Sequence, residues 1–106
     1  MNNTYEVCLV SDSTGETLDR IFLALKAQFK NTKYKINQYS FTRTKNQVLK
    51  IIDICKKKKN SIILYTIVDT KLTKYLTVIT EKEKIPCFGV LLVRLTPNKI
   101  ISDFFI

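Results

Sequence analysis

A short polar segment between an apolar run and an amphipathic run carries the residue types best suited to phosphate chemistry. Hydroxyl, acidic and glycine residues lie there within seven positions, where a helix is expected to begin. Backbone N–H groups at a helix start are unpaired and lie at the positive end of the helix dipole, so they attract anions. The candidate residues for binding a phosphate or a phosphorylated substrate in this segment are Ser11, Ser13, Thr14, Gly15 and Thr17.

Two later segments add groups that could share this site. Arg43 and Thr44 follow the second expected strand, and Asp69 follows the third. An arginine fork suits phosphate, whereas the carboxylates of Asp12 and Asp69 could accept a proton from a nucleophile or hold a metal. The pattern fixes no catalytic residue, and Asp12 and Asp69 are the candidates. Because parallel strands end at one edge of a sheet, we expect Asp12, Arg43 and Asp69 to lie together.

Most of these residues also have an ordinary structural explanation. Hydroxyl residues such as Ser13 and Thr44 are common helix caps, Gly15 can ease a turn, and Asp69 can be an N-cap. Arg43 is harder to explain in this way, because a helix cap does not need a guanidinium. The functional interpretation therefore rests on the three segments meeting at one edge.

Four segments have the composition of β-strands. Residues 7–10, 61–67 and 87–93 contain apolar runs that are typical of strands covered on both faces. Residues 34–41 interleave polar and charged side chains, which favours the edge of a sheet. The sequence therefore predicts three buried strands and one edge strand.

Apolar residues recur at helical spacing between these strands, and polar caps precede each recurrence. The lysine run at residues 56–59 falls where the second helix should end, so we expect it to be solvated and to favour the negative end of the helix dipole. The expected helices cover about residues 14–30, 44–56 and 70–84, with capping boxes at Ser13–Glu16 and Thr44–Gln47 and a cap at Asp69 or Thr70.

Strand and helix alternate three times before the fourth strand, which is an α/β pattern. Right-handed crossovers and the polar second strand favour a three-layer, flavodoxin-like parallel sheet in the order 2-1-3-4 with three helices. We expect one domain over residues 1–93 and a divergent tail over 94–106. No amphipathic helix follows the fourth strand, so the fold looks incomplete there. We expect that an absent downstream region or a homo-oligomer covers that flank, or that the short domain tolerates the exposure and is prone to associate.

Composition argues against several functional classes. The chain has no histidine, which removes imidazole acid–base chemistry and argues against a zinc or iron site, so we expect no metal. Its formal net charge is +9, but the lysines are spread along the chain and accompany no RNA-binding or zinc-finger pattern. We therefore expect no specific nucleic-acid partner.

The cysteines and the chain's hydropathy indicate a cytoplasmic protein. Cys8, Cys55 and Cys87 form no CxxC pair and lie in apolar surroundings, which is typical of buried free thiols in a reducing compartment. The first six residues lack the pattern of a signal peptide, and the run 87–93 is too short to cross a bilayer. We expect no membrane partner.

Four segments together resemble a known family. They occur in the family's order and at compatible spacings, and they cover nearly the whole chain. The chain is similar to the N-terminal region of the pyruvate, phosphate dikinase and phosphoenolpyruvate synthase regulatory proteins. The segments are VSDSTGET at residues 10–17, FTRT at 41–44, LYTIVD at 64–69 and IPCFGVL at 85–91.

The resemblance implies a bifunctional regulator. Family members use ADP to phosphorylate a threonine of the dikinase or the synthase, and remove that phosphate with inorganic phosphate to give pyrophosphate. They are longer than this chain and carry a P-loop-like nucleotide-binding motif in a C-terminal region. Because Gly15 and Gly89 are the only glycines here, that motif is absent. We expect a truncated protein that is inactive alone and has no bound cofactor of its own.

The residues leave other functions open. The same polar groups would suit a non-catalytic module that binds phosphate, a nucleotide or the target protein. A receiver-like phosphoacceptor domain would use Asp69 or Asp12, but its paired acids and its fifth-strand lysine are missing. A nucleic-acid role would require salt-sensitive binding stronger than a generic polycation gives.

Overall fold

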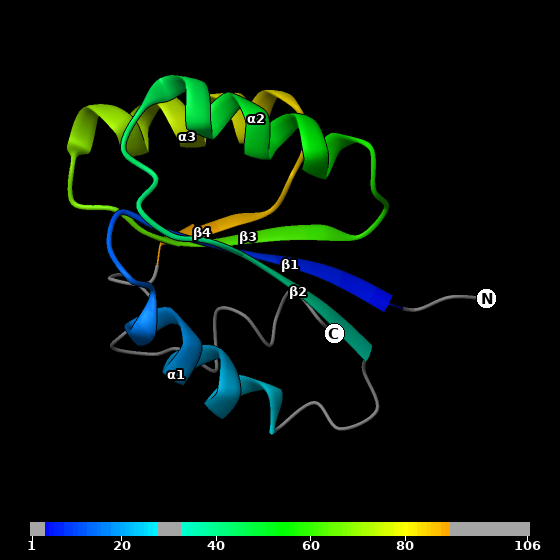
Figure 1. The fold of residues 1–106 in the computed structure, drawn as a ribbon. Helices are drawn as coiled ribbons and strands as arrows, with labels where there is room; N and C mark the ends of the chain where they lie inside the picture. Colours follow the sequence, from blue (N-terminus) through cyan, green and yellow to red (C-terminus); the bar gives the residue numbers. More distant parts are fainter. Residues whose placement is uncertain (1–3, 28–32, 90–106) are drawn as a thin grey trace.

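Strands and helices alternate strictly along the chain in the computed structural model, which describes residues 4–27 and 33–89. Figure 1 shows the sheet between two layers of helices. The elements are β1 (Thr4–Ser11), α1 (Glu16–Lys26), β2 (Lys33–Tyr39), α2 (Lys45–Lys56), β3 (Ser61–Thr66), α3 (Thr70–Lys82) and β4 (Cys87–Gly89).

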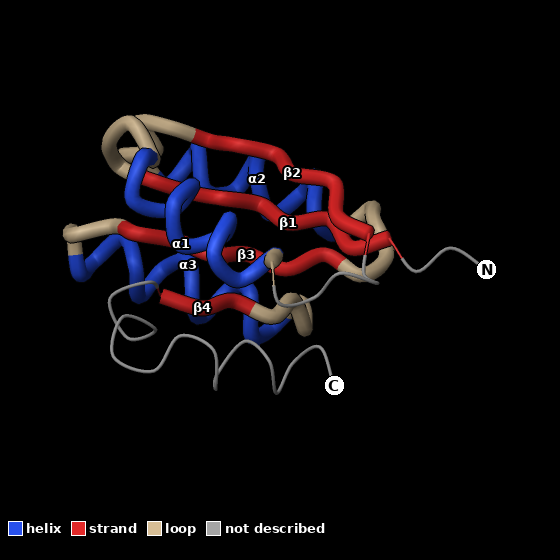
Figure 2. The backbone as a smooth tube through the Cα atoms, turned by 90° about the horizontal axis from the view of Figure 1, so that it is seen from below, coloured by secondary structure: helices blue, strands red, loops and turns tan. Residues whose placement is uncertain are grey.

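The four described strands form one parallel sheet in the order β2-β1-β3-β4, which confirms the predicted fold class and strand order. In the centre of the sheet, Val7 of β1 pairs with Ile36 on one side and Ile62 on the other. Figure 2 shows the strands side by side, with α1 on the near face and α2 and α3 behind. All three helices therefore begin at the edge where the strands end.

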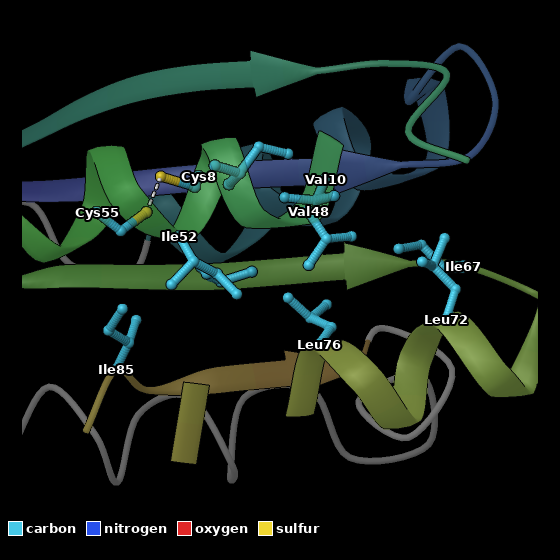
Figure 3. Close-up of a cluster of buried hydrophobic side chains, with 11 residues drawn as sticks. Cys8, Val10, Val48, Ile52, Cys55, Ile67, Leu72, Leu76 and Ile85 are labelled. Atoms are coloured by element: carbon cyan, nitrogen blue, oxygen red, sulfur yellow. Dashed lines mark hydrogen bonds between the residues drawn. The ribbon is translucent and has the colours of Figure 1, made fainter. Parts of the chain in front are cut away.

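Alternating side chains of the central strands fill the core on both faces of the sheet, because successive residues of a strand point to opposite sides. Val7 and Leu9 pack with Leu18 and Phe22 of α1. Cys8 and the residues that share its face pack toward α2 and α3, as Figure 3 shows. That second cluster contains Cys8, Val10, Val48, Ile51, Ile52, Cys55, Ile63, Ile67, Leu72, Leu76 and Ile85.

The edge position of β2 is confirmed, since Lys33, Lys35 and Gln38 are exposed there. The caps of the second and third helices are confirmed as well. Thr44 and Gln47 form the predicted capping box of α2, and Asp69 is the N-cap of α3. The polar edge strand and the two helix caps are therefore local features that the sequence predicted correctly.

The predicted start of the first helix was wrong. α1 begins at Glu16, two residues later than predicted, and Gly15 directly precedes it, with the Asp19 amide donating to the Gly15 carbonyl at 3.0 Å. The Ser13–Glu16 capping box does not form, because the Ser13 amide donates instead to Ser11 Oγ at 3.0 Å. The helix ends at Lys26, and its predicted last residues, 28–30, lie outside the described residues.

Some predictions fall partly or wholly on the undescribed end of the chain. β4 is described over Cys87–Gly89, whereas the predicted residues 90–93 lie outside the described residues. The domain boundary at residue 93 and the tail 94–106 lie there too, so both stay predictions. Cys8 and Cys55 are buried free thiols as expected, and the free thiol of Cys87 is half-buried.

Candidate functional site

The loops that follow β1 and β2 are held together by backbone hydrogen bonds at the carboxyl edge of the sheet. The Thr42 amide donates to the Ser11 carbonyl at 2.8 Å, and the Phe41 amide donates to the Ser13 carbonyl at 3.0 Å. On the other side of β1, the Asp12 amide donates to the Thr66 carbonyl at 3.3 Å, which extends the pairing with β3. Three loops are thereby brought to one place.

A cleft of about 580 Å³ opens between these loops and the starts of α2 and α3. It contains the three residues that we expected to meet from the order of the strands. The chain therefore brings two carboxylates, one guanidinium and an apolar wall together. The lining residues are Asp12, Thr42, Arg43, Ile67, Val68, Asp69 and Leu72.

Arg43 is held in the cleft by one nitrogen. Its Nε donates to the Asp12 backbone carbonyl at 3.1 Å, and its guanidinium lies 5.3 Å from the centre of the Phe41 ring. Among the residues that the structure describes, no acceptor engages its two terminal NH₂ groups. An arginine fixed through Nε keeps these groups for two parallel hydrogen bonds to a phosphate or a carboxylate.

The two carboxylates of the cleft also organise backbone. Asp12 Oδ2 accepts from the Val68 amide at 2.8 Å, which ties the β1 loop to the β3 loop. Asp69 Oδ1 accepts from the amides of Lys71 at 2.9 Å and Leu72 at 3.3 Å, as an N-cap does. In both residues the second carboxylate oxygen has no hydrogen-bond partner within the described chain. These oxygens remain candidates for accepting a proton, and that role stays a prediction.

Several sequence-predicted residues have structural contacts outside the cleft lining. Ser11 is buried, and its hydroxyl lies 3.2 Å from that of Ser13. The Thr14 carbonyl accepts from Ser40 Oγ at 3.0 Å, and Thr44 caps α2. Gly15, with φ of 87°, and the exposed Thr17 belong to the turn into α1 and its first residues. Their expected contacts with phosphate stay predictions.

Electrostatics favour the cleft over the turn into α1 as an anion site. The first turn of α1 carries Glu16 and Asp19, whose negative charges oppose an incoming phosphate. The first turns of α2 and α3 carry no acidic residue. Arg43 adds a positive charge beside both of these helix starts, although Asp12 and Asp69 partly offset it. Among the candidate residues, Arg43 is therefore the one best placed for an anion, and its contact with phosphate stays a prediction.

Sequence reasoning missed two side chains of the site. Thr42 is buried at the base of the cleft, where its hydroxyl donates to the Tyr39 carbonyl at 3.2 Å. Val68 is 78% exposed on the cleft wall. Both residues belong to segments that carry the family resemblance. For Val68, the signal in the sequence was an apolar residue directly before the Asp69 cap.

Neither a metal cluster nor a membrane span is present in the described part of the chain. No three His, Cys, Asp or Glu side chains of residues 4–27 and 33–89 gather in a way that could hold a metal ion. No described helix has the length and apolar character needed to cross a bilayer.

The family described as kinase/pyrophosphorylase matches residues 7–99, which include every residue that lines the cleft. The chain belongs to this kinase/pyrophosphorylase family. The match begins within β1 and covers all the later described elements, so the family assignment and the fold concern the same part of the chain.

Relatives in this family carry the name pyruvate, phosphate dikinase regulatory protein. The protein from Pelagibacter ubique is 65% identical over 91 residues, which are 86% of this chain and 33% of the relative. The protein from Agrobacterium fabrum is 37% identical over 87 residues, or 82% and 32% of the two chains. That from Ehrlichia chaffeensis is 32% identical over 88 residues. The chain thus spans about a third of the length of these relatives.

Proposed function

We propose that this chain takes part in regulating pyruvate, phosphate dikinase, and that its cleft binds the phosphate that is transferred or consumed. The observation that carries the proposal is the state of Arg43: its Nε is anchored on the Asp12 carbonyl, its terminal NH₂ groups are unused within the described chain, and two helix starts lie beside it. Such an arrangement suits a small doubly charged anion.

The reaction class follows from the family and from the names of the relatives. In one direction the β-phosphoryl group of ADP would pass to a threonine hydroxyl of the dikinase, giving AMP and phosphothreonine. In the other, inorganic phosphate would attack phosphothreonine, giving pyrophosphate and the free hydroxyl. Both directions need an anion held beside a group that can accept or return a proton. Arg43 would hold the anion, and Asp12 or Asp69 would handle the proton.

A non-catalytic role in binding the target protein has a specific observation in its favour. Val68 on the cleft wall is 78% exposed, and Phe41, which packs beside Arg43, is 51% exposed. Large apolar side chains next to an anion site are suited to a phosphorylated or phosphorylatable protein segment. Pyruvate, phosphate dikinase and phosphoenolpyruvate synthase are the two targets that fit this role.

Calorimetric titration of the purified chain with inorganic phosphate, pyrophosphate and ADP tests the proposal. We expect measurable binding of at least one of these at low salt. Arg43→Ala should weaken it about tenfold, because a charge-assisted hydrogen-bond pair is lost. Arg20→Ala is the matched control, since Arg20 is an exposed arginine on α1 that does not line the cleft.

Equal losses of affinity in both variants would mean that binding depends only on the chain's general positive charge. Unchanged affinity in Arg43→Ala would mean that Arg43 does not contact the anion. Absence of binding to all three anions, with binding to the dikinase retained and weakened by Val68→Asp, would favour the protein-binding role instead.

A further inference from the structure

Two thiols far apart in the sequence meet in the core. Cys8 of β1 and Cys55 of α2 are 47 residues apart, and their Sγ atoms lie 3.1 Å from each other. They are 2% and 1% exposed, and Figure 3 shows the two side chains pointing toward one another across the space between β1 and α2. Because an S–S bond is about 2.05 Å long, about 1 Å of movement would join these atoms.

An open cavity borders this pair on the side of Cys55. Cys55 lines an open cavity of about 410 Å³ at the end of the sheet opposite the cleft, together with Lys56 and Lys58. Lys58 Nζ also lies 3.2 Å from Glu6 Oε1, so it is held close to the pair. Because Cys55 is only 1% exposed, a small oxidant in this cavity would reach its sulfur through a local opening of the structure, and the nearby ammonium group favours a thiolate.

The surroundings make the two thiols unequal. The hydrogen bond to Cys8 lowers the pKa of Cys55, with Lys58 acting in the same direction and burial opposing both. The same hydrogen bond and burial raise the pKa of Cys8. Burial raises the pKa of Cys87 to about 12. Cys55 is therefore the thiol best suited to attack an oxidant, and Cys8 is the thiol next to it.

We propose that Cys8 and Cys55 form an oxidisable dithiol that a peroxide converts into a disulfide. The Cys55 thiolate attacks one peroxide oxygen, the O–O bond breaks, and with one proton taken up the products are a sulfenic acid and water. The Cys8 sulfur then attacks the Cys55 sulfur, the S–O bond breaks, and a second water leaves with the Cys8 proton. In total, two thiols and hydrogen peroxide give one disulfide and two waters, and the thiols supply both electrons.

The bond would connect β1 directly to α2. Both elements lead to the cleft, since β1 runs into Asp12 and α2 begins two residues after Arg43. A crosslink closing a loop of this length removes conformational freedom from the unfolded chain and stabilises the folded one. The dithiol is independent of the proposed phosphate binding, because its residues do not line the cleft.

Oxidation of the reduced chain by hydrogen peroxide, followed by alkylation under denaturing conditions and peptide mapping, tests the proposal. We expect the mass to fall by that of two hydrogens, the Cys8 and Cys55 peptides to be crosslinked, and Cys87 to remain alkylatable. The oxidised chain should melt roughly 10 °C higher than the reduced chain, and a thiol reductant should reverse the change.

The matched control is Cys87→Ser, which should give the same crosslink, whereas Cys55→Ser should give none. Peptide mapping of the oxidised wild-type chain identifies the crosslinked cysteines without any substitution, so the test holds even where a variant folds poorly. Three results would overturn the proposal: thiols that remain reduced under peroxide, a crosslink that involves Cys87, or oxidation of Cys55 to a sulfinic acid without a bond to Cys8.

Discussion

At the scale of single residues, Gly15 shows how a backbone requirement can resemble a binding motif. Its φ of 87° lies in the left-handed region, where side chains are strained. Space is not the constraint, because a Cβ at this position would have its nearest neighbour, Gln38 Nε2, at an ordinary 3.6 Å. The glycine in the SDSTGET segment is therefore explained by the turn into α1, whether or not a phosphate binds there.

Gly15→Ala should lower the free energy of unfolding by about 1–2 kcal/mol, because alanine is strained at this φ. Urea denaturation of the purified chain measures the loss. Thr17→Ala, in the first turn of the same helix, is the control and should change the stability by less than about 0.5 kcal/mol. A neutral Gly15→Ala would mean that the turn relaxes to another conformation.

The contacts of Glu6 indicate that part of the free energy of unfolding depends on pH. Burial raises the pKa of Glu6, but hydrogen bonds from Lys58 and Asn37 outweigh it and hold this pKa below its usual range. A carboxyl whose pKa is lowered by folding stabilises the protein above its unfolded pKa of about 4.3, and that contribution is lost as the pH falls through the folded value.

Glu6→Gln should therefore cost less than about 1 kcal/mol at pH 7, because the Lys58 partner is partly solvated, and the cost should vanish under acidic conditions. Thermal melts at a series of pH values check this. Glu81→Gln changes an exposed carboxyl on α3 and should give no such trend. A cost for Glu6→Gln that persists in acid would mean that packing, rather than charge, matters at this position.

At the scale of the elements, the first turn of α2 holds the arginine loop. Gln47 Oε1 accepts from the amides of Arg43 at 2.7 Å and Thr44 at 3.0 Å, and Gln47 Nε2 donates to the Phe41 carbonyl at 3.2 Å. Phe41 itself has a φ of 55°, which is unfavourable for a bulky residue. One glutamine thus helps to keep a strained loop in the shape that presents Arg43.

Gln47→Ala should lower the free energy of unfolding by about 1–2 kcal/mol, because the hydrogen bonds of the Gln47 side chain with Phe41, Arg43 and Thr44 are lost at an exposed site. It should also weaken phosphate binding, because the loop is released while Arg43 is intact. Denaturation and calorimetry on the same variant separate the two effects. Asn46→Ala, at a neighbouring exposed position on α2, is the control. Full retention of phosphate affinity in Gln47→Ala would contradict the positioning role.

The elements also show why some features could be predicted from the sequence and others could not. The strand order follows from the contrast between three apolar runs and one polar strand, and the caps of α2 and α3 follow from side chains at fixed offsets. The start of α1 was predicted wrongly because the Ser13 amide donates to Ser11 Oγ and not to the Glu16 side chain, as the expected capping box required. Which loop amide Asp12 engages depends on tertiary geometry that no local pattern contains.

Some features of the candidate site could be predicted from the sequence as well, whereas others required the structure. That Asp12, Arg43 and Asp69 share a cleft followed from the rule that parallel strands end at one edge. The sequence also contains the two acidic residues in the first turn of α1, next to the expected phosphate loop. Their unfavourable effect on anion binding could be compared with the surroundings of Arg43 only in the structure, where α2 and α3 begin beside that arginine. The contact of Cys8 with Cys55 joins residues too distant for any spacing rule.

At the scale of the whole molecule, the proposed anion contact of Arg43 is only one part of what phosphoryl transfer requires. The sequence contains only two glycines, so it offers no glycine-rich phosphate cradle, and it spans about a third of the length of its relatives. Phosphoryl transfer depends mainly on positioning and on neutralising several phosphate charges at once. Arg43 alone does not supply that.

Incubation of this chain with ADP labelled at its β-phosphate and with pyruvate, phosphate dikinase should therefore transfer no label to a dikinase threonine. Phosphopeptide mapping of the dikinase provides the measurement, with a sample lacking the chain as the background. Phosphate binding should be retained in the same preparation. Efficient labelling would contradict the prediction and show that the cleft suffices for catalysis.

The central place of β1 also affects how the protein is made. Its partners lie at residues 33–39 and 61–66, so a ribosome completes this strand well before either neighbour exists. Sheets built from such distant pairings form slowly, and apolar strands left uncovered in a nascent chain invite aggregation. Until Thr66 has emerged from the exit tunnel, Val7 to Val10 have no complete sheet to enter, and these apolar side chains wait uncovered for their second neighbouring strand.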